Sequence, residues 1–139
     1  RISEKSQYEA KSNSFSYFQL RICDVAGCVA AATLDGSPVR FNLALTDPIE
    51  PMLEAEGSEW RGVAGDYVVE FGPKSSAEPG HDASLPTLQA GVGAFTRLWL
   101  GVQPASGLAA TDDLAGPVEL LADLDRILCL PDPKPDWDF

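Results

Sequence analysis

The stretch that decides the fold is Val-Arg-Phe-Asn-Leu-Ala-Leu, residues 39–45. Its apolar and polar side chains alternate, with Val39, Phe41, Leu43 and Leu45 on one face and Arg40, Asn42 and Ala44 on the other. A period of two is typical of a β-strand with one buried face, because successive side chains point to opposite sides of a sheet. The sequence therefore predicts a strand whose apolar face belongs to the core.

Further strands are predicted on both sides of this stretch. Residues 18–23 alternate in the same way. Residues 60–63 and 67–71 flank Ala-Gly-Asp, which favours two strands joined by a tight turn into a hairpin. Residues 87–90 are one more short strand.

Helices are predicted between and after the strands. Asp24 is a typical N-cap for a helix over residues 25–33. Apolar residues spaced by three and four predict a helix over 92–100 and a longer one over 117–128, and residues 104–116 hold a short helix without clear limits. Because strands and short helices mix without a regular βαβ rhythm, we expect an α+β domain, in which a mostly antiparallel sheet is covered on one face by helices.

The 139 residues are enough for one domain with one core. Residues 1–15 are polar and rich in serine, which indicates a flexible linker or arm, and residues 16–139 form the domain. Residues 72–86 are dense in Gly, Pro and Ser and are expected to be a surface loop. Since the chain does not begin with Met, we expect a piece of a longer protein.

The charge of the chain restricts its partners. Ten basic and 21 acidic side chains give a net charge of -11, which disfavours nucleic acid and anionic membranes. The excess acid indicates either a solvated exterior or a surface that attracts a cationic ligand or a basic partner. No run approaches the ~20 apolar residues of a membrane span, and no signal peptide opens the chain, so a soluble, cytoplasmic protein is expected.

The chain offers few residues for catalysis. His81 is the single histidine, and it lies in a Gly/Pro-rich loop with no scaffold to hold a triad. The three cysteines, Cys23, Cys28 and Cys129, lack the spacing of a zinc site and are expected to be packed thiols. We therefore predict no catalytic group of this chain's own and no metal.

Motifs for a calcium ion or a cofactor are equally weak. Asp112-Asp113 lacks the glycine-centred loop of a calcium site and indicates surface or capping groups. Gly91-Val92-Gly93 is too short for a nucleotide fingerprint, and no glycine run suits the pyrophosphate of acetyl-CoA. No cofactor is predicted.

Large rings are more numerous than a small core requires. Most should be ordinary core, whereas the functional alternative is an apolar cavity for a lipid or another apolar small molecule. The candidate residues for such a cavity are Phe41, Trp60, Tyr67, Phe71, Phe95 and Trp99.

Three segments, residues 20–25, 40–47 and 94–101, resemble the sterol-carrier-protein-like domain that ends GNAT N-acetyltransferases of the enhanced-intracellular-survival (Eis) type. The resemblance implies a sheet of about five strands and a non-catalytic role as a scaffold. It also implies an acetyltransferase domain in cis, or self-association, as the partner. The carboxylate of Phe139 would then accept a proton in the larger enzyme, with Trp137 anchoring the tail. The alternative is a free-standing carrier of an apolar ligand.

Overall fold

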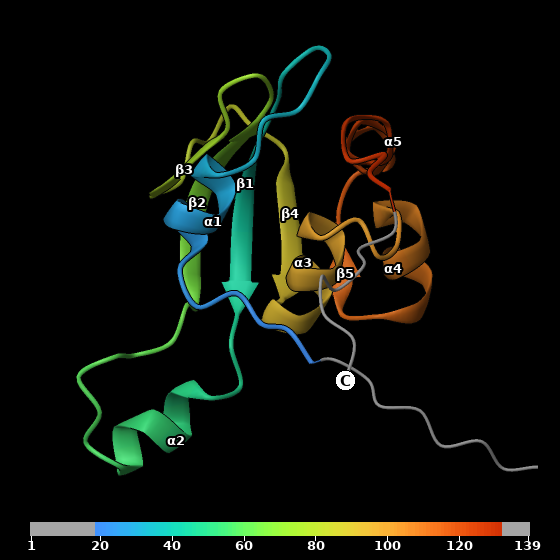
Figure 1. The fold of residues 1–139 in the computed structure, drawn as a ribbon. Coiled ribbons are helices and arrows are strands. Elements are labelled where there is room, and N and C mark those ends of the chain that lie inside the picture. The colour runs from blue at the N-terminus through green and yellow to red at the C-terminus, as the bar shows by residue number, and fades with distance from the viewer. Residues whose placement is uncertain (1–18, 132–139) are drawn as a thin grey trace, which may run out of the picture.

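A five-stranded sheet forms the centre of the protein in the computed structural model, which describes residues 19–131 (Figure 1). The strand order is β3-β2-β1-β4-β5. The strands are β1 (Val39–Thr46), β2 (Gly65–Phe71), β3 (Ser76–Pro79), β4 (Thr87–Gly91) and β5 (Leu114–Ala115). The strand predicted over residues 39–45 is thus the middle strand of the sheet.

The sheet is mixed. Strands β1 and β4 are parallel, with Leu43 opposite Leu88, whereas the other three neighbouring pairs are antiparallel. Strands β1, β2 and β3 follow one another as an antiparallel meander, and β4 joins on the far side of β1. The prediction of an α+β domain with a sheet of about five strands is thus confirmed.

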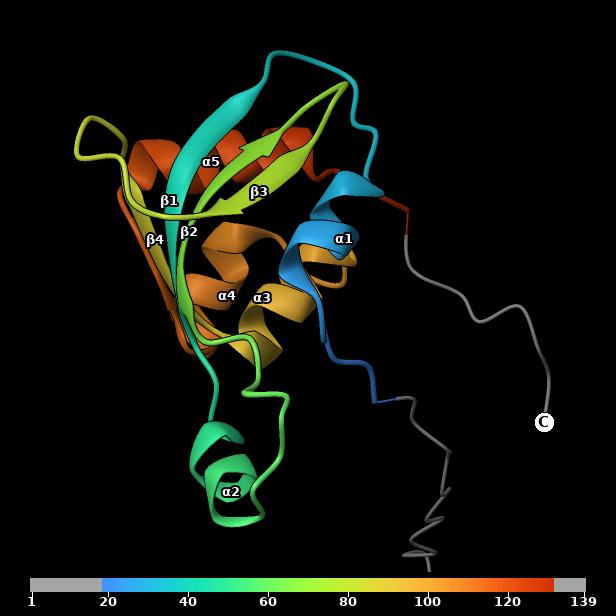
Figure 2. The same ribbon diagram turned by 90° about the vertical axis from the view of Figure 1, so that its left-hand side faces the viewer.

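Helices lie mainly on one face of the sheet, and Figure 2 shows α1, α3 and α4 on the same side of it. The helices are α1 (Val25–Ala30), α2 (Glu50–Ala55), α3 (Val92–Trp99), α4 (Ala105–Thr111) and α5 (Val118–Ile127). The largest fully buried side chains come from the sheet and the helices, and include Phe41, Phe71, Phe95, Leu88 and Leu124. The sheet and these helices therefore share one core.

Local sequence explains where the helices begin. The Asp24 carboxylate accepts a hydrogen bond of 3.0 Å from the Gly27 backbone N–H and caps α1 as predicted. Helix α5 buries Leu120, Leu124 and Ile127, which are spaced by four and three residues. The predicted helices over 25–33, 92–100 and 117–128 are confirmed with slightly shorter limits.

Three predicted elements differ from the structure. Residues 19–23 form no strand, because the Ile22 N–H donates to the Thr96 hydroxyl at 3.2 Å instead of to a neighbouring strand. Residues 60–63 form no hairpin with β2, whose two edges are occupied by β1 and β3. The predicted loop 72–86 contains strand β3. In each case, contacts with other segments of the chain determine the structure, and the local sequence pattern does not show these contacts.

None of the helices within residues 19–131 combines the length and apolar character needed to cross a membrane. The predicted linker over residues 1–15, and the predicted roles of Trp137 and Phe139, lie outside the described residues.

Candidate functional site

A pocket of about 470 Å³ lies where β1 and β4 end and α3 begins. The carboxyl ends of β1 and β4 lie side by side. The segments that follow these two parallel strands leave the sheet in different directions, which leaves room for a ligand between them. The lining residues are Thr46, Asp47, Pro48, Gly91, Val92, Gly93, Ala94, Arg97, Asp112 and Asp113. Three of these carry carboxylates.

Asp47 is the most buried of the three, with a side chain that is 0% exposed. Its carboxylate pairs with the Arg21 guanidinium and accepts hydrogen bonds from the backbone N–H groups of Val63 (3.0 Å) and Ile49 (3.1 Å). Burial alone would raise the pKa of Asp47, but these donors outweigh it and lower the pKa below its usual value. Asp47 is therefore ionised and fully engaged in holding the backbone around it.

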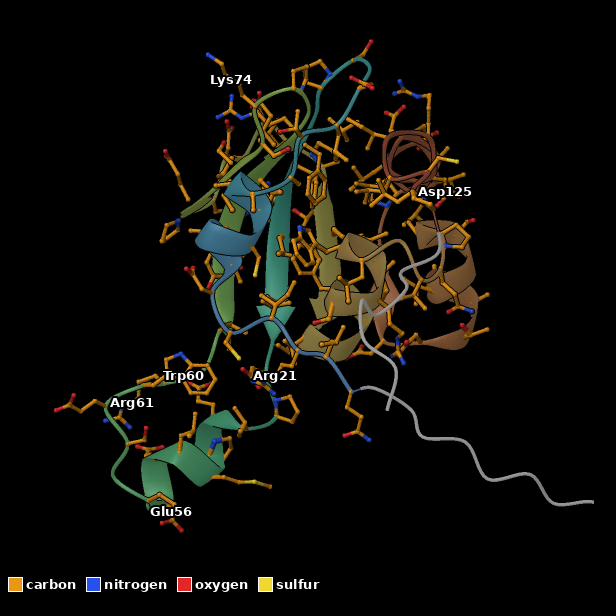
Figure 3. The ribbon with its side chains drawn as sticks, viewed as in Figure 1. Arg21, Glu56, Trp60, Arg61, Lys74 and Asp125 are labelled. Atoms are coloured by element: carbon orange, nitrogen blue, oxygen red, sulfur yellow. The ribbon has the colours of Figure 1, made fainter. Side chains whose placement is uncertain are left out.

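Arg21 joins Asp47 to an aromatic side chain from another part of the chain. Its guanidinium carbon lies 5.8 Å from the centre of the Trp60 ring, within cation–π range. Figure 3 shows Arg21 and Trp60 close together where α2 leaves the body of the domain. The segment before α1, the end of β1 and the segment after α2 thus meet at one ion pair, of which the carboxylate is buried and the guanidinium partly buried.

Two glycines allow the chain to approach these carboxylates closely. Gly62 has a φ of +87°, and a Cβ atom there would lie 2.8 Å from the Asp47 carboxylate oxygen. A Cβ atom on Gly91 would lie 2.7 Å from the Asp113 carboxylate oxygen. Any larger residue would displace the acid beside it.

Asp112 and Asp113 form the other side of the pocket. Arg97 from α3 pairs with Asp112, and the Asp112 carboxylate also accepts from the Asp113 N–H at 2.9 Å. No cation within residues 19–131 is paired with Asp113. Since Arg21 and Arg97 each balance one acid, the pocket keeps an excess of negative charge at Asp113.

Gly91-Val92-Gly93 lies at the turn from β4 into α3, the kind of position where helix N-termini bind phosphate in other proteins. Here, however, the Gly91 N–H donates to the Asp113 carbonyl at 2.9 Å, and three carboxylates line the same pocket. Arg97, the cation among the lining residues, is engaged by Asp112. The site does not fit the pyrophosphate of acetyl-CoA.

The structure separates the six aromatic candidates. Phe41, Phe71 and Phe95 are each 0% exposed and belong to the core. The Tyr67 hydroxyl donates to the Val63 carbonyl at 2.9 Å. Trp60 lies on the surface, and Trp99 is half-buried with an indole N–H that has no partner within the described residues. None of the six lines the pocket.

The remaining candidate residues lie apart from the pocket as well. His81 is exposed, and beside it the Asp82 carboxylate accepts from the Ser84 hydroxyl at 2.6 Å. The expectation of three packed thiols is wrong for Cys23 and Cys129, which are exposed: each follows a buried residue, Ile22 or Leu128, and lies on the outer side of the chain there. Cys28 is half-buried, and burial raises the pKa of its thiol.

Sequence reasoning missed the residues that form the pocket. Asp47 was not among the predicted site residues, and Asp112-Asp113 were expected to be surface or capping groups. The available signal was a polar residue directly after a buried strand, which marks a strand end where sites form. The pairing of β1 with β4 in parallel, which brings the two strand ends together, was not readable from local pattern.

Comparison with solved structures gives the fold a context. A GCN5-related N-acetyltransferase from Kribbella flavida matches 81% of this chain with a TM-score of 0.63 at 22% identity. A GCN5-related N-acetyltransferase from Anabaena variabilis matches 81% with a TM-score of 0.64 at 17% identity. In each case the match covers 26% of the other chain, so this chain spans about a quarter of the length of these proteins. No protein-family model and no curated protein matches the sequence.

These matches correct the sequence-based interpretation. Both matched structures are of N-acetyltransferases, and neither is described as a sterol carrier protein. The prediction of a sterol-carrier-protein-like domain, non-catalytic or carrying a lipid, is therefore wrong, and so is the prediction that the chain is not an enzyme. At this level of identity, the likeness establishes a shared fold.

Proposed function

We propose that these residues are a domain of an N-acetyltransferase, and that the pocket at the ends of β1 and β4 receives the amine to be acetylated. The observation that carries the proposal is the unbalanced carboxylate of Asp113 in a pocket at the ends of two parallel strands. The fold shared with GCN5-related N-acetyltransferases supplies the reaction class.

Charge decides which of the two substrates suits this pocket. Acetyl-CoA carries several negative charges, and a pocket lined by three carboxylates with one engaged guanidinium repels it. An amine is a cation at neutral pH and is attracted both by Asp113 and by the net charge of -11. The amine is the substrate that these residues favour, and the polyanionic donor belongs to another part of the enzyme.

The pocket contributes position and charge to the transfer. In the reaction, the ammonium group first gives up one proton to water. The neutral amine nitrogen then attacks the thioester carbonyl, an N–C bond forms, the C–S bond breaks, and CoA leaves as a thiolate that takes up the second proton lost by the nitrogen. Asp113 holds the ammonium form as it arrives and orients it, because a carboxylate accepts charge-assisted hydrogen bonds from an ammonium group. Asp47 and Arg97 keep the walls of the pocket fixed through their ion pairs.

The test uses the complete protein that contains these residues, acetyl-CoA, and a panel of mono-, di- and polyamines. Release of free thiol from CoA reports the transfer. Asp113→Asn is expected to raise KM for a diamine by about tenfold, which corresponds to a loss of ~1.4 kcal/mol, with a smaller change in kcat.

Glu119→Gln is the matched control, because Glu119 is an exposed acid on α5 away from the pocket. It is expected to leave KM unchanged. The proposal fails if no amine is acetylated, or if Asp113→Asn behaves like Glu119→Gln. If Asp113→Asn raises KM for acetyl-CoA and not for the amine, the pocket binds acetyl-CoA and the proposal is wrong.

A further inference from the structure

The segment between β1 and β2, residues 48–62, leaves the body of the domain as an arm. Figures 1 and 2 show its helix α2 extending beyond the end of the sheet, away from the other helices. Helix α2 has six residues, and none of them is buried. A helix this short is marginal in water by itself, so it gains little stability from its own hydrogen bonds or from the core.

The arm nevertheless presents large apolar side chains. Met52 is 68% exposed and Trp60 is 39% exposed. A methionine and a tryptophan are residue types that protein interfaces use as anchors, since both bury a large area at one point. Their exposure on a projecting segment marks a contact surface.

The charges of the arm specify its partner. Around Met52 and Trp60 it carries the four glutamates Glu50, Glu54, Glu56 and Glu59, against a single basic residue, Arg61. Figure 3 shows Glu56 at the far end of the arm and Arg61 near its base. A receiving surface must therefore combine an apolar groove with a basic rim.

A second copy of this chain is a poor match for the arm. Its ten basic side chains are outnumbered by 21 acidic ones, so a second copy would meet the arm with like charge. An anionic membrane would repel the arm for the same reason.

The base of the arm is fixed. The backbone N–H groups of Ile49, at the start of the arm, and of Val63, directly after its end, both donate hydrogen bonds to the Asp47 carboxylate. Arg21 neutralises that carboxylate. A fixed base lowers the conformational entropy lost when a projecting segment binds. The arm is held out in advance of its contact.

We infer that residues 48–62 are a docking arm that inserts Met52 and Trp60 into an apolar groove rimmed by Lys and Arg, on protein outside residues 19–131. The inference does not depend on acetyl transfer. Pro48 lines the pocket and also begins the arm, so the arm starts at the edge of the pocket.

Photo-crosslinking in the native cell tests the inference. One variant of the complete protein carries Met52→p-benzoylphenylalanine, and a control carries Val118→p-benzoylphenylalanine at a site that is 77% exposed on α5. The Met52 variant is expected to crosslink to a peptide outside residues 19–131 that contains Lys or Arg beside apolar residues, with the Val118 variant giving little product.

Charge reversal provides the second readout. Glu54→Lys with Glu56→Lys in the Met52 variant is expected to lower the yield of that crosslink about tenfold or more, whereas Glu119→Lys leaves it unchanged. The inference is overturned by crosslinks to residues 19–131 of a second copy, by crosslinks to lipid, by equal products from both positions, or by no product. Thiol release with amines is measured on the same preparations, so a failed acetylation is recognised separately from a failed docking.

Discussion

Strand β1 and the arm that follows it directly are stabilised in opposite ways. Six of the eight residues of β1 are buried or half-buried hydrophobic or amide side chains, whereas no residue of the arm is buried. The body is stabilised by apolar burial, and the position of the arm depends on one buried ion pair at its base. The comparison shows that apolar packing stabilises the body of this domain, whereas an ion pair and its hydrogen bonds position the base of the projecting arm.

The largest effect is expected from emptying the core. Leu124 is 0% exposed, so Leu124→Ala should lower the free energy of unfolding by ~3 kcal/mol, because it removes apolar burial and leaves a cavity. Urea unfolding measures the change. Val118→Ala, at a residue that is 77% exposed, is the control and should change stability by less than ~0.5 kcal/mol. Equal losses would contradict a core centred under α5.

A smaller loss is expected from the ion pair at the base of the arm. Asp47→Asn leaves the Arg21 charge partly buried and weakens two backbone hydrogen bonds, so we expect a loss of ~2 kcal/mol. Asp112→Asn, in the more exposed pair with Arg97, should cost less than ~1 kcal/mol. If the two variants unfold alike, the buried pair has no special role.

Next in size is the glycine beside that pair. Gly62→Ala forces a Cβ atom to within 2.8 Å of the Asp47 carboxylate at a φ of +87°. We expect a loss of ~1–2 kcal/mol from strain. Gly57→Ala is the matched control within the arm, since Gly57 also has a positive φ but no atom within 4 Å of an added Cβ. Equal losses at Gly57 and Gly62 would show that backbone strain alone acts and that the contact with Asp47 adds nothing.

The pH dependence of stability separates the two regions further. The pKa of Asp47 is lower in the folded protein than its ordinary value, so its contribution is present above the unfolded pKa of ~3.9 and is lost as the pH falls through the folded pKa. The difference in unfolding free energy between the native protein and Asp47→Asn should therefore shrink below about pH 4. Thermal unfolding at pH 7 and at successively lower pH measures it. A constant difference across this range would contradict the prediction.

The smallest effect is expected on the arm itself. Met52→Ser should change the unfolding free energy by less than ~0.5 kcal/mol, because the side chain is 68% exposed. Urea unfolding of the isolated chain checks it. A clear destabilisation would mean that Met52 packs against the body of this same domain.

The body was more predictable from sequence than the arm and the pocket. Period-two and period-three-to-four patterns identified β1, α3 and α5, because each has an apolar face that is buried. The segment 60–63 was predicted to be a strand, yet it is the returning part of the arm, because both edges of β2 are paired with other strands. Local pattern records which face is buried and not which strand is adjacent.

The candidate site was predicted least well. Asp47 and Asp113 are 66 residues apart in numbering and meet only because β1 and β4 pair in parallel. The sequence instead favoured six aromatic residues as site candidates, and three of them, Phe41, Phe71 and Phe95, belong to the core. A pocket assembled from strand ends is encoded in topology, which a single sequence shows only indirectly.

The parallel pairing of β1 with β4 also sets the order in which the domain is completed during synthesis. The β1-β2-β3 meander uses neighbouring segments and can form once residue 79 has left the ribosome. Asp113, the last residue to line the pocket, emerges 34 residues later, after the residues of β4 and α3. A nascent chain therefore has its arm and meander before the pocket at the ends of β1 and β4 is complete.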